Sequence, residues 1–127
     1  MDARGLVYFV ESNDPVRLTH LATLVMSGVL LDRPVVVVWM GRALGHLMSG
    51  GLDAVPTGDA AVATDETSPG ALLREARQLG SVTFLACSAD ARRLNLDRAA
   101  FLARVDDVLA MTTILHRIEG AGTVLYL

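Results

Sequence analysis

The fold of this chain is decided by the stretch VTFLACSADARR at residues 82–93. Its first half is β-branched and apolar enough for a buried strand. Its second half opens with Ser88, a residue type common at helix N-caps, and continues with helix-forming residues. A strand that passes directly into a helix is the building unit of a parallel α/β sheet. Cys87, the single cysteine in 127 residues, is therefore expected where a parallel strand ends and a helix begins.

Strand patterns recur on both sides of this stretch. Residues 6–10 (LVYFV) and 35–40 (VVVVWM) are continuous apolar runs, as expected of strands covered on both faces. A final strand is predicted at residues 123–127, after a glycine-containing turn. Together with residues 82–87 these segments make four predicted strands.

Helical patterns separate the strands. Asp14 and Pro15 are typical of a helix start, and the helix is expected to reach about Leu31. Further helices are predicted at residues 42–48, at 71–79, where Ser68 and Pro69 start the helix, and at 88–94. Asp97 is expected to cap a long last helix over residues 98–117. Its predicted apolar face comprises Phe101, Val105, Val108, Leu109, Thr112 and Leu115. Asn95 is expected to take a left-handed conformation before it.

Alternating strands and helices predict an α/β fold, a single domain over residues 1–127 with a mostly parallel sheet between helix layers. The segment from Leu52 to Pro69 interrupts this alternation. It is rich in Gly, Ala, Thr, Asp and Pro and lacks a period, so we expect a long surface loop, less ordered than its flanks and close to Cys87.

Composition excludes several classes of function. The net charge is −3 without a basic run, which argues against nucleic acid as a partner. A lone cysteine and three scattered histidines give no metal-type spacing, so neither a metal nor another cofactor is expected. The longest apolar stretch is too short to span a membrane, the N-terminus lacks signal-peptide order, and a reduced, cytoplasmic setting is expected.

The apolar content points to self-association. Apolar residues make up 52% of the chain although aromatic residues are only 5%, and the mean hydropathy is +0.43. An aliphatic excess of this size predicts either a large core or apolar surface buried between subunits, so a homo-oligomer is expected.

Common catalytic motifs are missing from the sequence. Residues 11–14 (ESND) lack the glycines of a dinucleotide fingerprint, and there is neither a phosphate-binding Gly-Lys-Ser/Thr nor a Gly-x-Ser-x-Gly elbow. A response-regulator receiver would need a phosphoacceptor Asp where this chain has Cys87.

The candidate site is therefore built around Cys87. Loops that follow parallel strands meet at one edge of the sheet, so Ser12, Asn13 and Gly41 are expected near the thiol. Ser88 begins the adjacent helix, whose N-terminus would favour thiolate. Arg92 lies about a turn further on. It either assists an anionic sulfur or is a solvated charge on an amphipathic helix, and Cys87 itself is either reactive or a small core hydrophobe.

Taken together, these segments resemble the DsrE/DsrF-like family of small sulfur-relay proteins. The resemblance rests on residues 6–14, on the strand ending WMG at residues 39–41, on ACS at 86–88, on LNL at 94–96, on the acid-capped helix that follows and on the C-terminal strand. It departs from many relatives at Asn95, where they have glycine, and it lacks the second cysteine that some members carry near the long loop.

The resemblance implies a five-stranded, mostly parallel sheet and a trimer or hexamer. It also implies that Cys87 carries sulfane sulfur as a persulfide, passed between protein donors and acceptors without a metal. The alternative from a different functional class is a non-catalytic oligomeric binding module. In that module Cys87 is structural and the pocket at the strand ends binds a small ligand or partner.

Overall fold

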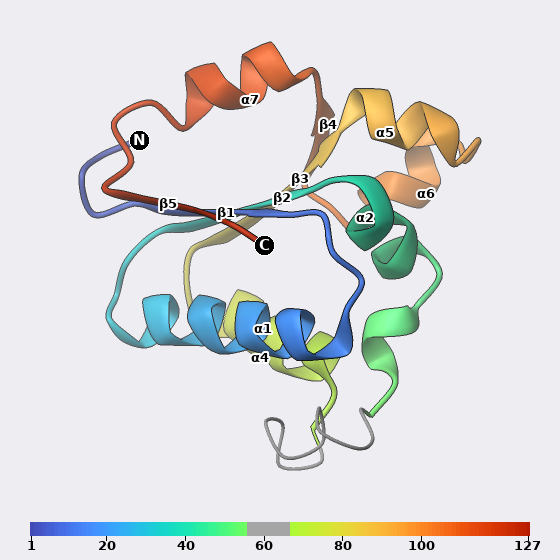
Figure 1. The fold of residues 1–127 in the computed structure, drawn as a ribbon. Helices are drawn as coiled ribbons and strands as arrows, with labels where there is room; N and C mark the ends of the chain where they lie inside the picture. The colour runs from blue at the N-terminus through green and yellow to red at the C-terminus, as the bar shows by residue number, and fades with distance from the viewer. Residues whose placement is uncertain (56–66) are drawn as a thin grey trace.

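The computed structural model describes residues 1–55 and 67–127. Its centre is a five-stranded sheet of order β4-β3-β2-β1-β5 (Figure 1). The strands are β1 (Leu6–Val10), β2 (Val35–Trp39), β3 (Val82–Cys87), β4 (Asp107–Leu109) and β5 (Thr123–Tyr126). Every neighbouring pair runs parallel, so the predicted α/β fold with a mostly parallel sheet is confirmed.

Helices cover the two faces of the sheet unequally. The helices α1 (Pro15–Leu30) and α4 (Pro69–Leu79) pack side by side beneath one face, called here the α1/α4 face. The helix α7 (Met111–Arg117) covers the other, the α7 face (Figure 1). The chain steps from β1 to β4 in one direction and then returns across the sheet to β5. Because parallel crossovers are right-handed, the returning helix must lie on the opposite face.

Shorter helices gather at the carboxyl ends of the strands. They are α2 (Gly41–Met48), η1 (Gly51–Asp53), α5 (Ser88–Arg93) and α6 (Arg98–Leu102). Alternate residues of each strand enter two cores. The larger core lies on the α1/α4 face and holds Trp39 and Phe84. The smaller one lies on the α7 face and is formed by Val7, Val38, Leu85, Ile114 and Ile118.

Three predicted helix starts are confirmed by their caps. The side chains of Asp14, Ser68 and Asp97 accept backbone N–H groups of α1, α4 and α6 respectively. Each therefore satisfies one of the donors that a helix N-terminus leaves free. Asn95 has the expected left-handed backbone, with φ 52°.

The predicted long last helix is wrong. The helix capped by Asp97 ends at Leu102, and residues 107–109 form β4 on the free edge of β3. Asp106 fixes this change, because its N–H donates to the Phe84 carbonyl (2.8 Å) and its carboxylate accepts the Phe84 N–H (2.7 Å). Helical spacing of apolar residues could not reveal that an open strand edge would compete for the same segment.

Two smaller predictions also change. A surface loop is expected from Leu52 onwards. Leu52 belongs instead to η1, and its side chain is buried against α2 and α4. The rest of that loop prediction falls mainly on residues 56–66, outside the described residues. The N-cap of α5 is Cys87, and Ser88 is the first helical residue.

Gly28 lies where α1 packs closely against the sheet. A Cβ added there would lie 2.7 Å from Leu6 Cδ1 and 2.9 Å from Val35 Cγ2. Gly28→Ala should lower the free energy of unfolding by about 1–3 kcal/mol, because a methyl group would overpack this contact. Urea denaturation measures the change. Gly45→Ala is the matched control, since its Cβ would meet only Leu94 at 3.7 Å. An equal or smaller loss at Gly28 than at Gly45 would contradict this packing.

Candidate functional site

Cys87 lies where the connections of neighbouring strands diverge. From the end of β3 the chain passes through α5 and α6, whose Ala91 and Phe101 join the core on the α1/α4 face. From the end of adjacent β4 it enters α7 on the opposite face. Such a divergence is the position at which open α/β sheets form their ligand crevice. Cys87, paired in register with Leu109, occupies this switch point.

The side chain of Cys87 belongs to the α7 face of the sheet. Strand alternation places it on the same side as Leu85, which packs in the smaller core. Its register partner Leu109 and the next residue after β2, Met40, are half-buried apolar side chains of that face. Cys87 is a free thiol with 6% of its surface exposed. The thiol therefore lies just beneath an apolar rim.

Polar contacts tie the carboxyl ends of the central strands together next to this thiol. The Gly41 N–H, at the start of α2, donates to Asp90 Oδ2 in the first turn of α5 (2.9 Å). The Gly41 backbone has φ 47°, and a Cβ there would lie 2.9 Å from Cγ of Glu11. Glycine is therefore required by both its conformation and the Glu11 side chain that packs over it.

The same line of contacts extends to the edge strand β5. The Tyr126 hydroxyl donates to Glu11 Oε2 over 3.4 Å, and its ring stacks on Phe9. Desolvation and then the Glu11 carboxylate raise the pKa of Tyr126 above its ordinary value of 10.0. The phenol is therefore a neutral hydrogen-bond donor at neutral pH. Its negative neighbours, Glu11 and Asp90, give this edge an acidic character.

The predicted binding residues fall into separate groups. Gly41 begins α2 and Ser88 begins α5, and the hydrogen bond from the Gly41 N–H to Asp90 joins these two helix starts. Ser12 and Asn13 follow β1, two strands away from β3, so they lie about 10 Å from the thiol by strand spacing. The Ser12 hydroxyl accepts the Asp14 N–H (3.0 Å) and so shapes its own turn.

Arg92 lies apart from the thiol. It borders a small hollow of about 160 Å³ together with Phe101 and Val108, which both pack on the α1/α4 face. Arg93 is the arginine that reaches toward the site's carboxylate, with Nη1 3.9 Å from Asp90 Oδ1. Its side chain is largely exposed, so the contact adds little stability.

Sequence reasoning missed Glu11, Asp90 and Tyr126 as parts of this edge. Asp90 could have been predicted from the sequence, because it lies three residues after Cys87 in the first turn of a predicted helix. The position of Tyr126 could not have been predicted, because β5 lies beside β1 only after α7 has crossed the sheet. Long-range strand order decides which polar residues become neighbours.

Within residues 1–55 and 67–127, no three His, Cys, Asp or Glu side chains come together as metal ligands. Over the same described ranges, no helix combines the length and apolarity needed to cross a membrane.

Comparison with known proteins identifies the fold alone. No family model matches the sequence, and no curated protein matches it. Among solved structures, a protein of unknown function from Methanobacterium thermoautotrophicum is similar, with 20% identity and a TM-score of 0.64. The alignment covers 95% of this chain and 97% of that one. At this identity the likeness supports the architecture and carries no function.

Proposed function

We propose that this chain is a sulfur-relay protein of the DsrE/DsrF-like type that carries sulfane sulfur as a persulfide on Cys87. The observation that carries the proposal is the position of the lone cysteine at the switch point of the sheet. Cys87 is also the N-cap residue of α5, so the strand that carries the thiol passes directly into a helix at this point.

The proposed transfer step needs no cofactor. The Cys87 thiolate attacks the outer sulfur of a donor persulfide and forms a new S–S bond to Sγ. The bond between the two donor sulfurs breaks, and the donor leaves as a thiolate that takes up a proton. A sulfur acceptor removes the outer sulfur from Cys87 by the same exchange. Since no second cysteine is present to resolve a disulfide, the relay runs between proteins, in a reducing cytoplasm.

The local surroundings suit a persulfide in two ways. Met40 and Leu109 offer the outer sulfur an apolar rim, where a polarisable atom packs well. The carboxylate of Asp90, which would oppose a nearby anion, is held by the Gly41 N–H. The structure thereby gives the acidic side chain a partner other than the thiol.

A second function is favoured by the burial of Cys87. With 6% of its surface exposed, the residue also fits a structural role in a non-catalytic oligomeric binding module. Alkylation of the native protein by iodoacetamide separates the two. A carrier thiol reacts while the chain is folded. A thiol that reacts only after unfolding assigns the protein to the binding-module class.

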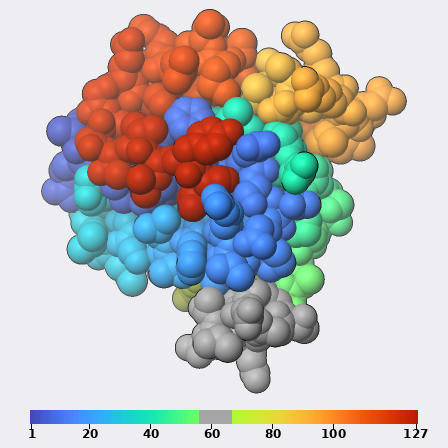
Figure 2. Space-filling model, viewed as in Figure 1, coloured from blue at the N-terminus to red at the C-terminus, as the bar shows by residue number. Residues whose placement is uncertain are grey.

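We further propose that the carrier is a homo-oligomer, a trimer or hexamer, assembled through β5. Within residues 1–55 and 67–127 this edge strand pairs with β1 alone, and its sequence TVLY bears no charged side chain to protect the edge. Val124 and Tyr126 are 53% and 62% exposed, and Figure 2 shows the β5 atoms, in red, uncovered on this face.

Light scattering should therefore give a mass of at least twice 13.5 kDa at micromolar concentration. Val124→Lys should shift the protein toward the monomer, because a lysine on an exposed strand edge opposes edge-to-edge pairing. Leu96→Lys, at an exposed apolar site away from β5, serves as the control. A monomeric native protein would rule the assembly out.

A further inference from the structure

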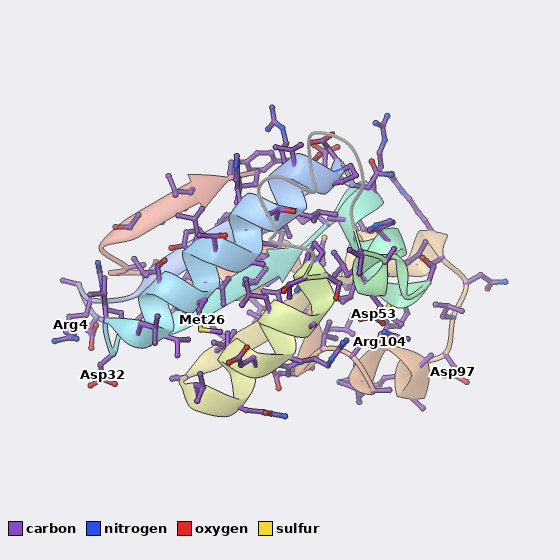
Figure 3. The ribbon with its side chains drawn as sticks, turned by 90° about the horizontal axis from the view of Figure 1, so that it is seen from below. Arg4, Met26, Asp32, Asp53, Asp97 and Arg104 are labelled. Atoms are coloured by element: carbon purple, nitrogen blue, oxygen red, sulfur yellow. The ribbon has the colours of Figure 1, made fainter. Side chains whose placement is uncertain are left out.

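A pocket unrelated to Cys87 lies between α4, η1 and the end of α6. Its volume is about 200 Å³, and its floor includes the side chain of Phe84 from β3. Phe84 packs in the core of the α1/α4 face, whereas Cys87 belongs to the α7 face. Figure 3 views the molecule from the α1/α4 face, and there Asp53 and Arg104 lie close together.

Three arginines line this pocket, and their pairing leaves an excess of positive charge. The Arg74 guanidinium pairs with the Asp53 carboxylate. Both carboxylate oxygens of Asp106 accept from Arg77 Nη2 at 3.1 Å. Arg104 has no carboxylate within 4.0 Å in residues 1–55 and 67–127. Among these described residues the two ion pairs cancel, which leaves the single positive charge of Arg104 as the net charge of the group.

The Arg104 side chain lies where its guanidinium can bind a ligand in the pocket. A Cβ added to Gly50 would lie 4.0 Å from Arg104 Nη2, so the side chain spans from the end of α6 to the turn before η1. Its backbone carbonyl accepts Arg77 Nη1 (3.2 Å), which fixes the base of the side chain. A guanidinium held at a pocket mouth can bind a carboxylate with two parallel hydrogen bonds.

The walls of the pocket next to these arginines are apolar, and the aromatic wall is held in place by Arg77. Leu52 and Leu73 are buried, and the Arg77 guanidinium lies 4.3 Å from the centroid of the Phe84 ring. This cation–π contact and the Asp106 ion pair hold the Phe84 ring and Arg77 in fixed positions. Pockets with apolar walls and a few convergent polar groups are the usual form of small-molecule sites.

We propose that this pocket binds a small organic monoanion, a carboxylate with a compact apolar body. The carboxylate pairs with Arg104, and the apolar body lies against Leu52, Leu73 and Phe84. The single uncompensated charge favours one negative charge on the ligand, and the volume of about 200 Å³ limits its size. The site is independent of sulfur transfer, because it lies on the opposite face of the sheet from the thiol.

Titration of the full-length protein with sodium benzoate, followed by amide NMR, tests this proposal. The amides of Leu52, Gly70 and Phe84 should show saturable shifts. Arg104→Gln should weaken benzoate at least about tenfold, because a charge-assisted hydrogen-bond pair is lost. Arg17→Gln, at an exposed arginine on α1, should leave the affinity unchanged. Neutral benzamide should bind at least about tenfold more weakly than benzoate, and cationic benzamidine more weakly still.

Three outcomes would overturn the proposal. Equal benzoate affinity in Arg104→Gln and the native protein would show that Arg104 does not pair with the carboxylate. Equal binding of benzamide would reduce the site to an apolar hollow. Saturable shifts confined to other residues, or none up to the solubility limit of benzoate, would place any ligand elsewhere. Because Arg104 is exposed and makes its backbone contact through the carbonyl, the variant should keep its fold, which its amide spectrum verifies.

Discussion

Cys87→Ser should abolish sulfur uptake from a persulfide donor. Intact-mass spectrometry after incubation with glutathione persulfide should show the native chain gaining one sulfur atom, lost again on reduction. The serine variant should gain none, because a hydroxyl is almost fully protonated at neutral pH and does not attack persulfides. The variant should remain folded, at a cost of about 1 kcal/mol for burying a hydroxyl near the surface.

The position of the thiol can be tested apart from its presence. In the double variant C87S/S88C the thiol moves by one residue, from the end of β3 into the first turn of α5. The site geometry predicts that uptake stays at the background level. Ser88→Ala alone should retain native uptake, because the Ser88 side chain does not cap α5. Native uptake in the double variant would show that any thiol in this region suffices and would refute a positioned carrier.

Ile114→Ala should cause the largest loss of stability, about 2–5 kcal/mol, the range observed when a fully buried aliphatic side chain is cut back to alanine. Ile114 is fully buried and belongs to the small core on the α7 face. With seven residues, α7 is too short to persist without this packing. Since α7 also carries the chain from β4 to β5, its loosening should expose the β1 edge of the sheet.

Urea unfolding measures this loss against a control on the same helix. Thr113→Ala, at an exposed neighbouring position, should change the free energy of unfolding by no more than about 0.5 kcal/mol. Hydrogen exchange in the Ile114→Ala variant should rise first in β5. A small, equal effect of both substitutions would mean that the smaller core contributes little to stability.

Several parts of the molecule could be read directly from the sequence because their causes are local. The caps Asp14, Ser68 and Asp97 bind backbone groups within three residues of themselves. The strand at residues 35–39 is fixed by a run of valines, and the left-handed turn at Asn95 by a side chain that tolerates it. The place of Cys87 at the end of β3 is also local, because an apolar, β-branched run gives way to helix-forming residues at this point.

Only tertiary structure decided which distant segments became neighbours. β4 forms because the edge of β3 is open and Asp106 binds the Phe84 backbone across 22 residues of sequence. The polar line from Tyr126 through Glu11 to Gly41 and Asp90 depends on strand order, and so does the distance of Ser12 from the thiol. The pocket that Arg104 borders joins residues of four elements, α2, η1, α4 and β3, and of the connection that follows α6. Spacing along the chain cannot encode such contacts, because they arise from the handedness of the crossovers and from the burial of two opposite sheet faces.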